Sequence, residues 1–505
     1  MAKTVVSALR WWARAAADRD AFVFEDQRLT YREVDERTSR IAKFLNSEGI
    51  EKGDRIVLRG ANSNEWALLA LGIIKAGAVI VPANSRLTPT ETQTVIDFSE
   101  AVMLIDDAAD RTLTLLSERR PELKTLDFGV FDQFAAGDSD WFGVETDSQD
   151  LVAILFTSGS TGTPKGVMQT NESVMGVIFE TLLVEEGYGQ GKSSLLALPL
   201  AFTPGVVSGI MTTIVTGGTL IIERTVDPVR ILRLIEEESV SALFGVPFLW
   251  EAMTQVPEFE TAKLDSIKSA WVGGAGVPLK LLNQFADKGV KLRQIYGCSE
   301  VGGISTATMM YESNDHPDSC GIGSVFSELK VLDANGKECG PGETGEILLR
   351  SSGRTAGYYG DPETTKSVYL EDGWLKTNDL GVLDEQGRLT FVDRVKDIII
   401  SGGINISPLE IEQAIISLPG VAEVTVIATR DEKFGETPVA IISVTEELTE
   451  ADVIAHCEEV LADYKVPRYV VIKDEPLPRM SNGKLAKMEI RAQYKDASER
   501  FEKVR

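Results

Sequence analysis

The chain is poor in the residue types on which several large enzyme classes depend. Its 505 residues include two histidines, His316 and His456, and four cysteines without paired spacing. With only two histidines, a Ser-His-Asp hydrolase or a histidine-ligated metal enzyme is hard to build. The scattered cysteines argue against a disulfide framework or a zinc ribbon. They fit a reduced compartment, so we expect a cytoplasmic protein.

Long apolar runs and positive charges are also scarce. The most apolar stretch, 66–82, is interrupted by Lys75 and two glycines, so it predicts a buried helix and a short strand rather than a membrane span. Lys and Arg number 51 against 77 Asp and Glu, which gives a net charge of −26. Such a surface repels nucleic acid and anionic lipid, so neither is expected as a partner. A phosphate-bearing substrate would need local lysines and backbone N–H groups.

The order of strand-like and helix-like segments predicts layered α/β structure with largely parallel sheets. "RIVLR" (55–59), "AVIVP" (78–82) and "SAWVGG" (269–274) read as strands with helices between them. Thr30 and Glu33 predict a capping box before a helix that ends near Gly49. The first 20 residues lack an uninterrupted apolar core and a convincing cleavage site, so we expect an ordinary helix there.

The pattern changes after residue 390. Ser407, Pro408 and Glu410 predict a capped helix start with a capping box, "AEVTVIA" (422–428) and "PVAIISV" (438–444) read as strands, and 449–462 as a helix. The fold class we expect is therefore α/β. It comprises a large N-terminal domain (1–393) of layered β-sheets and helices and a small, mobile C-terminal α+β domain (394–505) after a short charged hinge.

One segment has the composition of an anion-binding loop. "TSGSTGTPKG" (157–166) contains glycines, hydroxyl side chains, one proline and one lysine, but no acid. Glycine lets the backbone approach closely, and N–H groups and hydroxyls bind phosphate oxygens. A Walker-type P-loop is disfavoured, because Pro164 precedes Lys165 and "GVMQT" continues like a strand where a Walker lysine opens a helix. A Gly/Ser hairpin turn without a ligand is the alternative.

Five further segments follow this loop in order: "VGGAGVP" (272–278), "YGCSE" (296–300), "WLKTNDLG" (374–381), "DRVKDIIISGGINISPLEIE" (393–412) and "PRMSNGKLAK" (478–487). Together with the loop they resemble the motifs of the adenylate-forming superfamily, which includes acyl-CoA synthetases, adenylation domains and firefly luciferases. The resemblance spans nearly the whole chain. It implies that a carboxylic acid reacts with ATP to give an acyl-adenylate and pyrophosphate, and that coenzyme A then displaces AMP.

The resemblance also implies the nucleotide-binding residues. The phosphate loop would supply Thr157, Ser158, Gly159, Ser160, Thr161 and Gly162, with Lys165 either assisting or only stabilising the loop. Gly274, Ala275, Gly276, Tyr296 and Gly297 would surround adenine, and Asp379 and Arg394 would hold the ribose. Ser299 stands where threonine is usual and would touch the α-phosphate, and Glu300 would hold Mg²⁺. Asn378 replaces a usual glycine and tolerates positive φ better than most residues.

Lys484 matches the catalytic lysine of the first half-reaction. Its ammonium would neutralise charge between the attacking carboxylate and the α-phosphate. The resemblance further implies a rotation of the C-terminal domain about Lys396. The rotation would withdraw Lys484 and bring Gly402 and Gly403 to the path of the coenzyme A thiol.

The acyl pocket of the superfamily lies between the loop after "LPL", here 199–209, and the turn 301–306. Phe202 stands where many relatives have histidine, and "AFTPGVV" holds no aspartate of the kind that binds an amino acid's ammonium. These residues favour a hydrophobic acid, aliphatic or cyclic. The expected lining is Phe202, Val206, Val207, Phe248, Gly303 and Ile304, although some of these residues are also candidates for the core.

Free coenzyme A is the expected acceptor, because no carrier domain follows residue 505 in this sequence. The expected cofactors are ATP, Mg²⁺ and coenzyme A, and a homodimer is compatible with the resemblance. The alternatives are an acyl-AMP ligase that serves a separate carrier protein, an aryl-CoA ligase, luciferase-like oxidation and a non-catalytic nucleotide-binding protein. Because Lys484 and Glu300 are present, the last of these is disfavoured.

Overall fold

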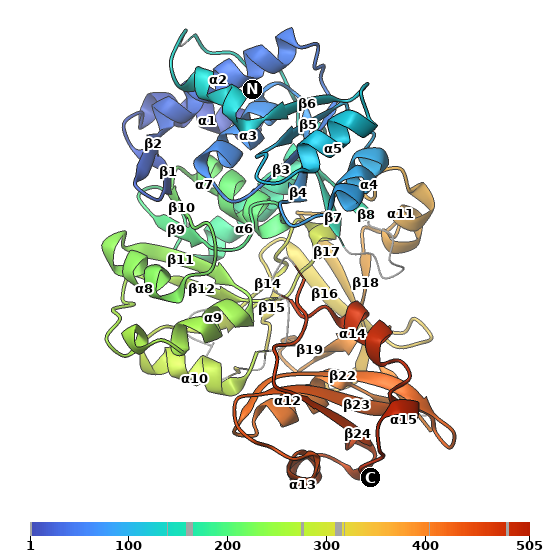
Figure 1. Cartoon of the computed structure of the whole chain (residues 1–505). Coiled ribbons are helices and arrows are strands. Elements are labelled where there is room, and N and C mark those ends of the chain that lie inside the picture. The colour runs from blue at the N-terminus through green and yellow to red at the C-terminus, as the bar shows by residue number, and fades with distance from the viewer. Residues whose placement is uncertain are drawn as a thin grey trace.

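Two large sheets form the first half of the N-terminal domain in the computed structural model (Figure 1). The structure describes residues 3–138, 140–157, 165–273, 277–308, 316–317, 319–402, 404–480 and 484–505. The seven-stranded sheet has the order β13 (Leu292–Gln294), β12 (Ser269–Val272), β11 (Val240–Gly245), β9 (Ser193–Leu196), β10 (Thr219–Ile222), β1 (Asp20–Phe24), β2 (Gln27–Thr30). The six-stranded sheet has the order β6 (Lys124–Asp127), β5 (Met103–Asp106), β3 (Arg55–Gly60), β4 (Val79–Asn84), β7 (Leu151–Thr157), β8 (Lys165–Thr170).

Both sheets are parallel except at one edge, where β1–β2 and β7–β8 are antiparallel. The predicted strands and their largely parallel pairing are therefore confirmed. The helices that connect and cover these strands are α1 (Val5–Ala15), α2 (Tyr31–Ser47), α3 (Asn64–Lys75), α4 (Pro89–Ser99), α5 (Thr112–Arg119), α6 (Asn171–Val184), α7 (Thr212–Thr216), α8 (Pro228–Glu237), α9 (Pro247–Thr254) and α10 (Leu279–Asp287). The Thr30–Glu33 capping box opens α2 as predicted.

Helix α3 explains how the two sheets share one core. It contacts β1 of one sheet and β3 and β4 of the other. A helix enclosed on both sides must be apolar all round, and every residue of α3 except Glu65 is buried. The stretch 66–82 is thus a buried helix and strand, as its sequence predicts. In the described part of the chain, no helix has the length and apolar character needed to cross a bilayer.

The last part of the N-terminal domain is an antiparallel sheet of four strands: β16 (Ser327–Leu332), β17 (Thr344–Ser351), β18 (Leu375–Leu383) and β19 (Leu389–Arg394). A pair of two-residue strands, β14 (Thr306–Ala307) and β15 (Ile322–Gly323), and helix α11 (Pro362–Val368) accompany it. Its core includes Val167 of β8 and Tyr296 of the YGCSE motif. This sheet therefore fixes the segments that carry the predicted nucleotide residues.

The C-terminal domain is a mixed sheet with helices on it, at the opposite end of the molecule from α1 (Figure 1). Its strands are β20 (Ile399–Ser401), β21 (Ile404–Ile406), β22 (Val421–Asp431), β23 (Gly435–Val444) and β24 (Tyr469–Lys473). Its helices are α12 (Pro408–Ile416), α13 (Glu450–Val460), α14 (Lys487–Tyr494) and α15 (Ala497–Arg500). The predicted fold class, a large α/β domain followed by a small α+β domain, is confirmed.

The start of α12 departs from the prediction in one respect. Ser407 is the N-cap, since its hydroxyl accepts the Glu410 N–H at 3.4 Å, and Pro408 opens the helix. The Glu410 carboxylate does not return to the cap, so the predicted capping box is wrong. It accepts two hydrogen bonds from Lys465 instead. A nearby ammonium attracts a carboxylate more strongly than one neutral N–H does.

Asp393 at the end of β19 supplies the missing cap. Its side chain is buried, and Oδ2 accepts hydrogen bonds from Ser407 Oγ and from the Leu409 N–H, both at 3.0 Å. The carboxylate also places negative charge at the N-terminus of α12, where the helix dipole favours it. The last strand before the predicted domain boundary is thereby fastened to the first helix beyond it.

We expect Asp393→Ala to loosen the first turn of α12, because the partly buried Leu409 N–H loses its acceptor at a cost of about 1 kcal/mol. Hydrogen exchange measured by mass spectrometry should become faster in the peptide that contains Leu409 and Glu410. Asp452→Ala, which removes an exposed capping carboxylate from α13 of the same domain, is the matched control and should affect only its own helix. Unchanged protection at Leu409 would contradict this role of Asp393.

Candidate active site

A cavity of about 1240 Å³ lies between the two domains. On one side it is lined by residues of α9 and α10, the end of β13, the middle of β18 and most of β19, and on the other by α12, β22 and Lys484. Six of the predicted site residues line it together: Tyr296, Gly297, Asp379, Arg394, Lys484 and Phe248. The fold thus brings together residues that are separated by up to 236 positions along the chain (248 to 484).

Asp379 is the centre of a small network in this cavity. Its Oδ2 accepts the Tyr296 hydroxyl at 2.8 Å, and its Oδ1 lies 3.6 Å from Arg394 Nε. Asp379 and Arg394 are also register partners on β18 and β19, so the sheet itself places the two charges side by side. Burial raises the pKa of the Asp379 carboxyl, while Arg394 and the Tyr296 hydroxyl oppose that shift. The residue before it, Asn378, has φ +58°, the left-handed conformation expected of this position.

Lys484 reaches the same network from the C-terminal domain. Burial and the neighbouring Arg394 lower the pKa of its ammonium from 10.5 to about 8, and Asp379 partly opposes this shift. Its own carbonyl accepts the Met480 N–H at 2.7 Å. A buried cation next to a guanidinium is a ready partner for an anion that enters the cavity.

Tyr296 stands on a tightly folded turn. Burial, together with the Asp379 carboxylate, raises the pKa of Tyr296 well above 10, so the phenol stays a hydrogen-bond donor. A Cβ on Gly297 would lie 1.8 Å from the Gly303 carbonyl oxygen, so only glycine fits there. The close approach brings the YGCSE motif against the 301–306 turn, which the sequence assigns to the acyl pocket.

Ser299 and Glu300 follow on the short helix η4 (Ser299–Val301). The Ser299 hydroxyl is 2.7 Å from Thr203 Oγ1, and its carbonyl accepts the Gln169 side chain at 2.9 Å. The Glu300 carboxylate accepts the Tyr358 hydroxyl at 2.8 Å. Neither Thr203 nor Tyr358 is in the predicted set.

Lys165 begins β8 and therefore opens a strand, which agrees with the argument against a Walker loop. Its Cα partner across the antiparallel pair is Thr157, the last residue of β7. Its ammonium lies 5.1 Å from the ring centre of Tyr358, the residue whose hydroxyl donates to the Glu300 carboxylate. The loop residues Ser158, Gly159, Ser160, Thr161 and Gly162, and likewise Gly274, Ala275, Gly276 and Gly403, lie outside the described residues.

The structure places the predicted acyl-pocket residues in different surroundings. Phe202 is half-buried, and Oγ1 of its neighbour Thr203 lies 2.7 Å from Ser299 Oγ, so the 199–209 segment reaches the short helix η4 that leads into the 301–306 turn. The segment is not a loop throughout, because a π-helix, η2, runs over Pro204–Met211. Val206 and Val207 point into the main core and are 1% and 0% exposed. Their part in acid binding stays a prediction, as does that of Gly303 and Ile304.

Phe248 lies at the contact between the domains rather than in the acyl segment. The Arg479 guanidinium lies 4.8 Å from its ring centre, and both residues line the cavity. Glu423 pairs with Arg479 through Nε at 3.0 Å, and partial burial raises the pKa of the half-buried Glu251 carboxyl nearby. This contact between the domains helps to hold Lys484 near the residues that are predicted to bind the nucleotide.

Lys396 lies between β19 and β20, in the short connection 395–398 that joins the two domain sheets. Asp397 on the same connection pairs with Arg491 at 2.9 Å. Gly402 donates its N–H to the Phe434 carbonyl at 2.8 Å and is not among the cavity-lining residues. The hinge and the coenzyme A path therefore stay predictions in this domain arrangement.

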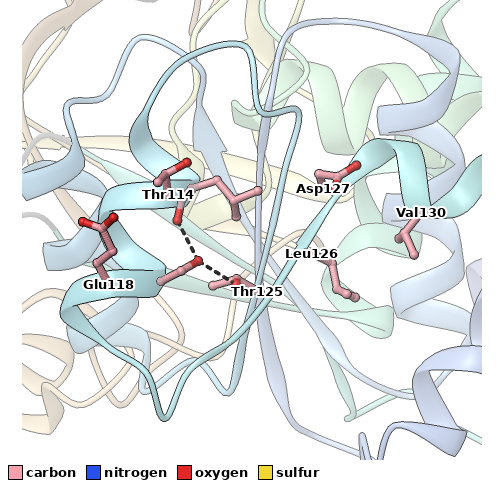
Figure 2. Close-up of a pocket in the computed structure, with 8 residues that line it drawn as sticks. Thr114, Glu118, Thr125, Leu126, Asp127 and Val130 are labelled. Atoms are coloured by element: carbon pink, nitrogen blue, oxygen red, sulfur yellow. Dashed lines mark hydrogen bonds between the residues drawn. The ribbon is translucent and has the colours of Figure 1, made fainter.

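A second, shallower depression of about 480 Å³ lies between α5 and β6, far along the chain from these residues (Figure 2). A hydrogen bond of 2.8 Å joins Ser117 and Thr125 at its floor. No predicted site residue is among the described residues that line it. The cavity between the domains is therefore the candidate active site.

The sequence signals for the residues that were missed are weak. Thr203 lies inside "AFTPG" and Tyr358 inside "TAGYYGDPETT", which predicts a turn before the capped helix α11. Nothing in either segment indicates that its hydroxyl reaches a residue 96 or 58 positions away.

Comparisons with known families match most of the chain. The family model of AMP-binding enzymes matches residues 9–359, and the model of the AMP-binding enzyme C-terminal domain matches residues 410–484. Feruloyl-CoA synthase of Amycolatopsis is 32% identical over 470 residues, covering 92% of this chain and 94% of that protein. Long-chain-fatty-acid–CoA ligase FadD13 of Mycobacterium tuberculosis is 34% identical over 477 residues, covering 93% and 94%.

Among solved structures, ATP-bound MatB from Rhodopseudomonas palustris superposes with a TM-score of 0.90 at 28% identity, covering 98% of this chain and 100% of that one. The apo structure of the same protein superposes with a TM-score of 0.79. The arrangement of the two domains here is thus nearer to that of the ATP-bound form.

The titration of Lys484 is a direct test of this site. We expect its amine to titrate near pH 8, Arg394→Gln to raise that pKa by removing a like charge, and Asp379→Asn to lower it by removing an opposite charge. Because the folded amine loses its proton before the unfolded one, Lys484 makes the folded state more stable as pH rises from about 8 to 10.5. NMR titration of ¹³C-methylated lysines would measure these shifts, with the surface residue Lys503 as the internal control. Shifts of the same sign in both variants would contradict the network.

Proposed function

Because this chain belongs to the AMP-binding enzyme family and is an AMP-forming acid–CoA ligase, we propose that it activates a hydrophobic carboxylic acid, aliphatic or cyclic, and transfers the acyl group to coenzyme A. The observation that carries the proposal is the convergence of Tyr296, Asp379, Arg394 and Lys484 on one cavity between the domains.

The chemistry accounts for this set of residues. A carboxylate is a poor acyl donor because its oxygen leaves badly, and adenylation replaces that oxygen with AMP. The acid oxygen attacks the α-phosphorus of ATP, the bond to the β-phosphate oxygen breaks, and pyrophosphate leaves. Such a reaction needs positioning and charge neutralisation more than covalent help from the protein.

Each residue has a part in that scheme. The Asp379 carboxylate accepts hydrogen bonds from both ribose hydroxyls, and Arg394 fixes the sugar edge. Tyr296 lies against the adenine, and the Thr157–Lys165 end of the β7–β8 pair faces the phosphates. Ser299 touches the α-phosphate. These contacts put local donors and cations where the overall charge of −26 would otherwise repel ATP.

Lys484 stabilises the charge that develops during adenylation. A unit charge at about 4 Å is worth on the order of 4 kcal/mol at an effective dielectric of about 20. Burial and the Arg394 guanidinium lower the pKa of this ammonium, and a phosphate brought next to it would favour the protonated form.

Mg²⁺ fits the donors that are present. No group of three or more His, Cys, Asp or Glu side chains suited to a metal occurs in the described residues. Mg²⁺ commonly binds through one or two carboxylates together with substrate phosphates, and Glu300 is a carboxylate of that kind. Bound there, the ion would neutralise phosphate charge while Glu300 orients it.

The acid itself is expected to be hydrophobic. Phe202 presents an apolar ring, and "AFTPGVV" holds no acid to bind an amino group. The relatives' names include feruloyl-CoA synthase and a long-chain-fatty-acid–CoA ligase, so both aryl and aliphatic acids are candidates. Rotation about Lys396, the Gly402–Gly403 path, a homodimer and a cytoplasmic location remain part of the proposal.

The acid preference can be measured by pyrophosphate release. We expect straight-chain fatty acids or aryl propenoic acids to support release, and amino acids of similar size to fail, because the pocket offers no partner for an ammonium. Release with an amino acid in preference to every hydrophobic acid would contradict the pocket assignment.

Measuring the two half-reactions separately tests whether Lys484 acts only in adenylation. Lys484→Ala should slow acyl-AMP formation by about 10²–10³-fold, the usual cost of removing one preorganised donor. Transfer from preformed acyl-AMP to coenzyme A should be largely unchanged. Lys503→Ala, a surface change in the same domain, should alter neither step. Equal losses in both half-reactions would overturn this role.

A further inference from the structure

The connection between β17 and α11, residues 352–361, runs alongside the strand that leaves the phosphate loop. The Met168 N–H donates to the Gly357 carbonyl at 2.9 Å, the Ala356 N–H donates to the Met168 carbonyl at 3.0 Å, and the Tyr359 N–H donates to the Gly166 carbonyl at 2.8 Å. Val167 and Tyr358 form an isolated antiparallel bridge. The backbone of Tyr358 is thereby tied to β8 directly after Lys165.

The Tyr358 side chain is held from several sides. It is 6% exposed, its ring packs edge-on against Tyr369 with centroids 6.0 Å apart, and its N–H donates to Thr365 Oγ1 at 2.9 Å. Gly357 before it has φ +104°, and a Cβ there would lie 2.4 Å from Thr365 Cγ2, so this turn needs glycine. Because the Tyr358 ring is held this firmly, it can fix the orientation of the side chains that it contacts.

The contacts of Tyr358 reach two predicted functional groups. Its hydroxyl donates to Glu300 Oε1 at 2.8 Å, and its ring face lies 5.1 Å from the Lys165 ammonium. The same connection also fixes the Glu300 backbone, whose carbonyl accepts the Thr355 N–H at 3.1 Å and the Thr355 hydroxyl at 3.0 Å. The carboxylate of Glu300 and the charge of Lys165 are thus set relative to each other through one side chain.

We propose that Tyr358 is a positioning residue that orients the Glu300 carboxylate toward the metal ion and keeps Lys165 directed at the ATP phosphates. The inference rests on the proposed function and adds to it a residue that acts through its contacts with Glu300 and Lys165. The hydroxyl orients the Glu300 carboxylate through a hydrogen bond, and the ring orients Lys165 through a cation–π contact.

The test uses the full chain and a non-hydrolysable ATP analogue. Mn²⁺ affinity of the protein–nucleotide complex is measured by electron paramagnetic resonance, and metal-free nucleotide affinity by calorimetry. Tyr358→Phe should weaken Mn²⁺ binding by about 10- to 100-fold, because a hydrogen bond to a charged group is lost, and should leave metal-free nucleotide affinity unchanged. Tyr358→Leu should weaken both, because Lys165 loses the ring as well.

Tyr359→Phe is the matched control. The Tyr359 hydroxyl donates to a carboxylate oxygen of Glu100 at 3.0 Å, a bond of the same chemistry on the protein surface. Its removal should change neither affinity. Thermal unfolding of each variant shows whether it is folded, and the isosteric Phe variant keeps the test available if Tyr358→Leu does not fold.

The double variant Glu300→Gln/Tyr358→Phe shows whether Tyr358 acts through Glu300. It should bind Mn²⁺ no more weakly than Glu300→Gln alone, because the effect of Tyr358 passes through that carboxylate. Additive losses, or unchanged Mn²⁺ affinity in Tyr358→Phe, would overturn the inference. A wild-type protein that releases no pyrophosphate with any acid would instead overturn the proposed function, and the metal and nucleotide affinities would still decide the role of Tyr358.

Discussion

The Asp379 carboxylate accepts the Tyr296 hydroxyl at 2.8 Å and faces the Arg394 guanidinium at 3.6 Å, and these two contacts join the parts of the molecule that form the candidate site. Tyr296 follows β13, an edge strand of the seven-stranded sheet, and Asp379 belongs to the antiparallel sheet. Arg394 is the last residue before the connection to the C-terminal domain. Lys484 enters this network from the far side. A movement of the C-terminal domain would therefore change the charge next to Asp379 directly.

The site must also work against the charge of its own protein. A net charge of −26 repels a nucleoside triphosphate, so the attraction has to be local. Arg394 and Lys484 line the cavity from different domains, Lys165 stands at the start of β8, and each of the three lies close to an acid or an aromatic ring. Fixed cations of this kind act strongly over a few ångströms, while the diffuse surface charge is screened by salt beyond about 10 Å.

Local sequence rules predicted much of the architecture, and the exceptions share a cause. The buried helix α3 and the capped start of α2 follow from periodicity and capping preference, and the left-handed Asn378 follows from the superfamily motif together with the tolerance of Asn for positive φ. Glu410 fails as a capping residue because Lys465, 55 positions later, takes its carboxylate. The expected loop at 199–209 is partly a π-helix, and Val206 and Val207 within it turn into the core. In each case a distant partner outweighed the local preference.

The sequence by itself determined the fold class and the order of the motifs, because these depend on residue pattern and short-range spacing. Its resemblance to the adenylate-forming superfamily supplied the predicted residues for phosphate, ribose and metal. Only the tertiary structure decided that Asp393 caps α12, that Phe248 contacts Arg479 at the domain boundary, and that Tyr358 links Glu300 to Lys165. These pairs are 16, 231, 58 and 193 positions apart along the chain. Hydrogen bonds and ring contacts act only over a few ångströms, so such pairs exist only after the chain has brought its distant segments together.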